Sequence, residues 1–195
     1  MRRLVGALLT VLGLALAGVL VAQLAVDRHE TAQAQQRLRA DVPDQAVVRG
    51  GSAVPVARPV PVGHALVTMR IPRFGPSWSW VASEGTSQTV LADGPGHYPQ
   101  TPLPGERGNV AFAAHRAGHG DPFIDFDRLR PGDLVELRQG ETSWTYVVDT
   151  EPRIVPASAS WVLDPLPGRR LTLTTCWPKY GSAKRMYVRA HLARA

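Results

Sequence analysis

Residues 171–180 read Leu-Thr-Leu-Thr-Thr-Cys-Trp-Pro-Lys-Tyr and contain Cys176, the only cysteine of the chain. Leucine alternates with β-branched threonine up to the cysteine, which predicts a strand. Trp177-Pro178 and then Gly181 follow, so the chain leaves the strand directly after the thiol. A side chain at a strand end is held rigidly and stays accessible, which favours a reactive Cys176. The alternative is a small buried hydrophobic residue, a frequent role of a free cysteine.

A second predicted strand, residues 109–114, ends in His115. A thiol needs ionisation or a neighbouring base to act as a nucleophile, and imidazole is the usual base. Arg185 opens the last predicted strand, and beside the thiol it could donate hydrogen bonds to an oxyanion. Taken singly, His115 also fits a hydrogen-bonded histidine at a strand end, and Arg185 fits a surface arginine.

The remaining chain favours a mainly β domain. Glycine (18) and proline (17) are frequent, and helical periodicity is scarce beyond the N-terminus. Short strands joined by turns are typical of sandwiches and barrels. The predicted strands are residues 65–71, 77–82, 88–92, 109–114, 134–138, 143–155, 171–176 and 186–192, with an irregular loop at 93–108 and a helical turn at 161–163.

The N-terminus has the pattern of a membrane segment. Residues 4–26 are apolar except for Thr10 and Gln23, which is long enough for a helix that spans a bilayer. Because this run exceeds the apolar region of most signal peptides, we predict an uncleaved signal anchor, with cleavage near residues 32–34 as the alternative. The predicted order is a cytoplasmic tail (1–3), the anchor (4–26), a stalk with a Pro-rich linker (27–63) and an extracytoplasmic domain (64–195).

The distribution of charge disfavours nucleic-acid binding as the function. The net charge is +6, and 20 of the 22 basic residues are arginine. These arginines are scattered, without a dense run or a patch interleaved with aromatic residues, which disfavours nucleic-acid binding. An anionic cell envelope is a simpler explanation for a basic surface. Outside the membrane, cysteines are normally paired, so a lone thiol is a candidate reactive group.

A metal site is also disfavoured. His115 and His119 stand four residues apart, with Asp121 and Asp125 beyond them. A zinc pair with this spacing normally needs a helix to bring both rings onto one face. Two glycines and a proline in this segment predict a loop instead. We therefore expect neither a metal nor another cofactor.

Together these residues resemble a known family. Thr172-Leu173-Thr174-Thr175-Cys176, the pair His115-Arg116 and Arg185 resemble the signature of the sortases, membrane-anchored cysteine transpeptidases of bacteria. Three further stretches resemble the actinobacterial class E form: residues 71–73, residues 94–99 with Pro104-Gly105, and residues 129–133. The resemblance covers roughly residues 64 to 193.

The resemblance implies a closed eight-stranded sortase-type β-barrel with short helices in its loops, outside the cell and behind one transmembrane helix. It implies Cys176 as nucleophile, His115 as general acid/base and Arg185 as a donor to the oxyanion or substrate. The expected substrate-binding residues are Tyr98, His119, Thr174 and Thr175. His119 stands where a tyrosine is expected, so a plain loop residue is the alternative there.

The implied reaction cuts a C-terminal sorting signal, of the Leu-Ala-x-Thr-Gly or Leu-Pro-x-Thr-Gly type, between Thr and Gly. The acyl group then passes through a Cys176 thioester to an amine of a peptidoglycan stem or cross-bridge, with a lipid-linked precursor as one form of the acceptor. Two alternatives remain. One is another envelope cysteine transpeptidase, although L,D-transpeptidases carry arginine where this chain has Pro178. The other is an anchored β-barrel that binds or scaffolds, with an inert Cys176.

Overall fold

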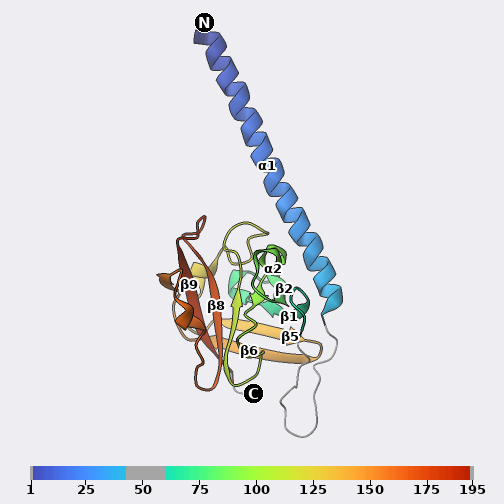
Figure 1. Cartoon of the computed structure of the whole chain (residues 1–195), viewed down its shortest axis with the longest axis vertical. Coiled ribbons are helices and arrows are strands. Elements are labelled where there is room, and N and C mark those ends of the chain that lie inside the picture. The colour runs from blue at the N-terminus through green and yellow to red at the C-terminus, as the bar shows by residue number, and fades with distance from the viewer. Residues whose placement is uncertain (1, 43–59, 194–195) are drawn as a thin grey trace.

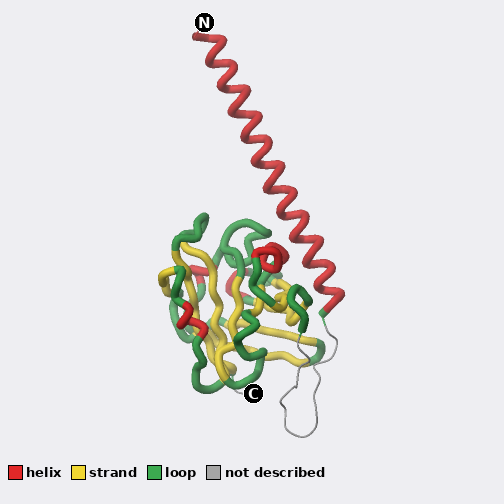
Figure 2. Tube along the Cα trace, in the orientation of Figure 1, coloured by secondary structure: helices red, strands yellow, loops and turns green. Residues whose placement is uncertain are grey.

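The computed structural model describes residues 2–42 and 60–193. A long N-terminal helix leads to a single β domain (Figures 1 and 2). The elements, in chain order, are α1 (Arg2–Asp41), β1 (Ala65–Arg70), η1 (Pro72–Phe74), β2 (Ser79–Glu84), α2 (Gln88–Asp93), β3 (Gly96–His97), β4 (Gly108–Ala113), η2 (Phe126–Arg128), β5 (Leu134–Gln139), β6 (Thr142–Val148), β7 (Arg153–Pro156), η3 (Ser160–Leu163), β8 (Arg169–Trp177) and β9 (Lys184–Leu192).

The strands close into a barrel. Their order is β6-β5-β1-β2-β3-β4-β8-β9, and β6 pairs again with β9, so eight strands form the ring. β7 lies outside the ring on the free edge of β9, where Ile154 pairs with Met186. The interior is filled by apolar side chains from all sides of the ring, among them Met69, Phe112, Leu137, Leu171 and Val188. The closed eight-stranded barrel that the resemblance implied is confirmed.

Two predicted strands were wrong in detail. Residues 88–92 form the helix α2, because the Ser87 hydroxyl accepts a hydrogen bond from the Val90 N–H and caps a turn too short to show helical periodicity. Residues 143–155 form two strands, β6 and β7, with a corner at 149–152 that moves the chain along β9. The loop predicted at 93–108 also contains the short strand β3. The helical turn at 161–163 is confirmed as η3.

The first part of α1 has the properties of a membrane segment. Its apolar side chains are exposed, for example Leu14 at 69% and Val21 at 66%, and none of its apolar window is buried against the domain. The helix is long and apolar enough to cross a bilayer. Most of the Pro-rich linker predicted within 27–63 lies outside the described residues.

The last part of α1 packs against the barrel rather than standing free as a stalk. Ala34 and Leu38 are buried, and Gln35 is 4% exposed. The Gln35 amide nitrogen donates to the carbonyls of Val81 (3.0 Å) and Asp93 (2.7 Å), and its oxygen accepts from the Val81 N–H (2.8 Å). Because β3 is too short to pair with β2 at Val81, this side chain supplies the missing backbone partner.

Replacing Gln35 by leucine should therefore destabilise the protein. The change leaves the buried N–H and C=O of Val81 without partners, each at a cost of about 1–3 kcal/mol, so we expect a loss of about 2–6 kcal/mol in the free energy of unfolding. Tryptophan fluorescence of the full chain in detergent during denaturation measures this loss. Gln36→Leu, at the exposed neighbouring position, is the matched control. Equal stability of the two variants would contradict the prediction.

Candidate active site

Two parallel strands bring His115 and Cys176 to the same end of the barrel. β4 and β8 pair in parallel with Ala113 opposite Thr174, so residues two further along, His115 and Cys176, follow in the same register. The pairing continues past β4, since the Ala114 N–H donates to the Thr174 carbonyl at 3.2 Å. Neighbouring strands lie about 4.8 Å apart, and residues in register point to the same side of a sheet. The imidazole and the thiol are therefore neighbours, and Cys176 is partly exposed.

The antiparallel partner strand adds Arg185. β8 and β9 pair with Cys176 directly opposite Arg185. One terminal guanidinium nitrogen of Arg185 donates to the carbonyls of Ser182 (3.0 Å), in the loop that joins the strands, and of Lys184 (3.1 Å), the first residue of β9. A cation held beside the thiol in this way can interact with negative charge that develops on a substrate carbonyl.

The predicted substrate-binding residues lie in different surroundings. The Tyr98 and Thr174 hydroxyls are 3.0 Å apart, and Thr174 lies two residues before Cys176, on the same face of β8. Thr174 and Thr175 are both buried, but Thr175 points to the opposite face, where its hydroxyl donates to the Ala114 carbonyl at 2.8 Å. Thr175 therefore ties β8 to the end of β4. His119 lies against His115, with ring centroids 4.8 Å apart.

The surroundings of His115 favour its neutral form. Burial lowers the pKa of His115 from 6.5, nearby His119 lowers it further, and Asp27 of α1 opposes this by raising it. The buried Nε2 atom of His115 has no hydrogen-bond partner among the described residues. A neutral imidazole beside a thiol can accept its proton and later return a proton to a leaving group.

This pKa shift predicts how stability depends on pH. The folded protein takes up the His115 proton at a lower pH than the unfolded chain, whose histidine titrates near 6.5. The unfolded state then binds more protons, so His115 reduces stability as the pH falls below about 6.5. Carbon-detected NMR of labelled histidine should give a pKa below 6.5 for His115, and His115→Gln should weaken the acid-side loss of Tm. A measured pKa at or above 6.5 would contradict this.

The sequence did not predict the buried contact between Arg116 and Trp177, next to the candidate catalytic residues. Arg116, 2% exposed, follows His115, and its guanidinium carbon lies 5.0 Å from the ring centroid of Trp177, which follows Cys176. Arg116 also pairs with Asp127 at 2.9 Å, while its Nε and Nη1 atoms are buried without partners in the described part of the chain. This cation–π contact joins the two segments that leave the candidate catalytic residues. The one signal in the sequence for this contact is that Arg116 directly follows His115 and Trp177 directly follows Cys176.

The histidines and aspartates near the candidate site do not form a metal site among the described residues. Among residues 2–42 and 60–193, no three His, Cys, Asp or Glu side chains are grouped as metal ligands. The Asp121 carboxylate accepts from the Gly118 N–H at 2.8 Å and pairs with Arg28 at 3.2 Å. His119 pairs with Asp27 at 2.9 Å. These side chains thus hold the loop to α1.

Comparison with known proteins agrees with this fold. Residues 69–193, more than half of the chain, match the Sortase domain family. The chain belongs to the sortase family. Sortases are cysteine transpeptidases, and the matched region runs from the end of β1 to the end of β9 and contains Cys176, His115 and Arg185.

The similar sequences are class E sortases, as the resemblance predicted. Sortase SrtE1 of Streptomyces coelicolor is 34% identical over 122 residues, which are 55% of this chain and 35% of that protein. Sortase SrtE2 of the same organism is 33% identical over 131 residues, 58% of this chain and 51% of that protein. The aligned part thus spans about a third of the length of SrtE1 and about half of the length of SrtE2.

Solved structures resemble the barrel domain more completely. Sortase E from Streptomyces avermitilis is 44% identical, with a TM-score of 0.65 over 69% of this chain and 91% of that chain. Sortase E1 from Streptomyces coelicolor, solved with a tripeptide in its active site, is 29% identical, with a TM-score of 0.61 over 68% of this chain and 90% of that one.

Proposed function

We propose that this sortase cuts a C-terminal sorting signal between Thr and Gly and transfers the acyl group to a peptidoglycan amine, so that secreted proteins become attached to the cell wall. The signal is of the Leu-Ala-x-Thr-Gly or Leu-Pro-x-Thr-Gly type. Residues 4–26 anchor the protein in the membrane, and the barrel lies outside. The register that aligns His115, Cys176 and Arg185 on three adjacent strands is the observation that carries this proposal.

Each of the three side chains has one role in the reaction. His115 accepts the thiol proton, and the sulfur of Cys176 attacks the threonine carbonyl. Arg185 donates hydrogen bonds to the oxyanion that forms. His115 then gives a proton to the departing glycine amine, which leaves a thioester. An acceptor amine attacks the thioester, its excess proton returns through His115, and the thiol is restored.

Tyr98, Thr174 and His119 are proposed to contact the signal peptide. Tyr98 and Thr174 form a hydroxyl pair on the Cys176 side of β8, which suits a peptide backbone or a small side chain. His119 lies beside His115 at the same end of the barrel. Thr175 is proposed to act by holding Ala114, because its hydroxyl is already bonded inside the barrel.

The test uses the full chain in nanodiscs, because α1 is part of the folded domain. The protein is incubated with a Leu-Ala-x-Thr-Gly peptide, a Leu-Pro-x-Thr-Gly peptide and an amine acceptor, and mass spectrometry follows cleavage and amide product. We expect product from at least one signal, and the faster peptide names the preferred motif. Absence of cleavage together with a Cys176 that resists alkylation would overturn the proposal and favour a non-catalytic barrel.

A further inference from the structure

The helix that precedes the barrel reaches its active-site end. One Asp27 carboxylate oxygen accepts from the backbone N–H of His119 at 2.7 Å, and the other lies 2.9 Å from His119 Nδ1. The next helical residue, Arg28, pairs with Asp121 at 3.2 Å. Two consecutive residues of α1 therefore hold the loop that follows His115. This contact joins positions 92 residues apart.

The loop has a conformation that requires outside support. Residues 118–121 all have positive φ values, and two of them, His119 (51°) and Asp121 (59°), are not glycine. A side chain in this left-handed region costs about 1–2 kcal/mol, so such a turn persists where surrounding contacts hold it. Gly120 packs so closely that an added Cβ atom would lie 2.7 Å from the Trp80 ring and 3.3 Å from Thr31 of α1.

The ring of His119 contacts the ring of His115. Their rings lie 4.8 Å apart between centroids and are inclined by 35°. Nε2 of His115 has no hydrogen bond within residues 2–42 and 60–193, so this ring contact is an interaction available to hold the imidazole in place. The side chain of Asp27 is 28% exposed and that of His119 is 40% exposed, so the chain of contacts lies partly sheltered between α1 and the loop.

We propose that Asp27 is a positioning residue for the reaction: it holds His119 by a hydrogen bond to the backbone N–H and by an ion-pair contact with Nδ1, and the His119 ring in turn fixes the imidazole of His115. The anchor helix thereby completes the active site of the barrel. This inference rests on the proposed function, in which His115 is the general acid/base. His119 acts here as a support for the catalytic ring.

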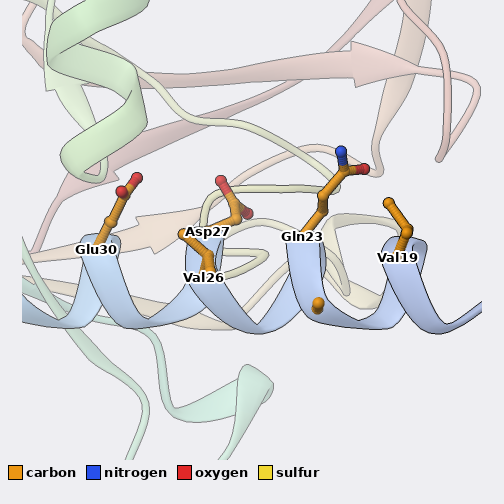
Figure 3. Close-up of a pocket in the computed structure, with 6 residues that line it drawn as sticks. Val19, Gln23, Val26, Asp27 and Glu30 are labelled. Carbon is orange, nitrogen blue, oxygen red and sulfur yellow. The ribbon is translucent and has the colours of Figure 1, made fainter.

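A neighbouring carboxylate on α1 provides a matched control. Gln23, Asp27 and Glu30 project from one side of α1 towards the domain (Figure 3). All three line a hollow of about 400 Å³ beside the helix. Glu30 is exposed, lies less than one turn after Asp27, and forms no ion pair or hydrogen bond among the described side chains. Glu30→Gln thus removes the same charge from the same face without touching the His119 loop.

The decisive experiment compares Asp27→Asn with Glu30→Gln in the full chain in nanodiscs. A misplaced acid/base group should lower kcat/KM for amide transfer about 10-fold or more in Asp27→Asn, mainly through kcat. His119→Gln, which loses the ring contact, should show a similar loss. His119→Phe, which keeps a ring without the Nδ1 contact, should lose less. Glu30→Gln should stay within about twofold of the parent protein.

The titration of His115 reports whether Asp27 and His119 lie close enough to act on the imidazole in the folded protein, and the kcat/KM comparison then tests positioning. The charged and titratable groups around His115 are His119, Asp121 and Arg116 of its own segment, Asp27 and Arg28 of α1, Cys176 of β8 and Arg185 of β9. Asp27 raises the pKa of His115 and His119 lowers it. By NMR, the pKa should therefore fall in Asp27→Asn, rise in His119→Phe and stay constant in Glu30→Gln.

These readouts separate the two hypotheses. Suppose the parent protein forms product and requires His115, but Asp27→Asn equals Glu30→Gln in rate and in His115 titration. That result would overturn the positioning role of Asp27 and leave the proposed function standing. Parent protein without any transfer would remove the proposed function. In that case an unchanged His115 titration in Asp27→Asn would also overturn the contact chain itself. A comparable Tm for all variants confirms that they fold.

Discussion

In the Cys176→Ala variant we expect neither cleavage of the sorting signal nor amide product. No other thiol exists in the chain to form the thioester. Removal of a catalytic nucleophile lowers the rate by about 10⁶-fold in enzymes whose acid/base group works only together with that nucleophile. A loss of this size places product of the variant below detection by mass spectrometry. The parent protein should show a mass increase for the acyl-enzyme when the acceptor amine is left out, and the variant should not.

The control for this prediction is the stability of the variant. Cys176 is only partly buried, so loss of its sulfur leaves little cavity, and we expect a Tm close to that of the parent protein. Ser182→Ala, in the exposed loop between β8 and β9, should remain active because the Arg185 contact uses the Ser182 backbone carbonyl. Product formation by Cys176→Ala would exclude covalent catalysis through this thiol.

The second large effect is expected for His115→Ala, with a loss of about 10²–10⁴-fold in kcat/KM, the usual contribution of a general acid/base. The loss should depend on the leaving group. An amide needs a proton on its departing nitrogen, whereas an activated ester does not. We therefore expect a much smaller defect when the variant acts on an ester version of the signal peptide.

The matched control is a histidine elsewhere on the barrel. His191 on β9 is half-exposed, bonds to Asp149, and pairs with Arg170 at the opposite end of β8 from Cys176. His191→Ala should keep full transfer activity. An equal defect of His115→Ala on amide and ester substrates would argue against proton donation to the leaving group and for a role confined to the attack by the thiol.

Much of the barrel and its three candidate catalytic residues could be predicted because their signals are local. Alternation in residues 171–176 and an apolar run in 109–114 predict strands, and each strand ends in a side chain with distinctive chemistry. The family resemblance then implied a closed eight-stranded barrel, which local patterns do not contain. The structure pairs β4 with β8 in the register that aligns His115 with Cys176.

The features that were missed depend on long-range contacts. Asp27 has no pattern that links it to His119, because 92 residues separate them and the contact exists only after α1 packs on the barrel. Gln35 reads as one of several glutamines in a polar segment, and its role depends on the shortness of β3. The helix α2 was missed because six residues are too few for a helical period to show.

Because α1 packs along the domain, a membrane anchor at residues 4–26 would also fix the position of the candidate active site relative to the bilayer. Asp41, beside His64 at one end of the contact, and Asp27, beside His119 at the other, are separated by 14 residues, or about 21 Å of helix. A bilayer around residues 4–26 would therefore begin at the level of the catalytic end. The enzyme would work in a thin layer along the membrane surface, where substrates tethered in the same membrane reach the thiol by lateral diffusion in two dimensions. Freely soluble proteins that carry the same signal would meet it far less often.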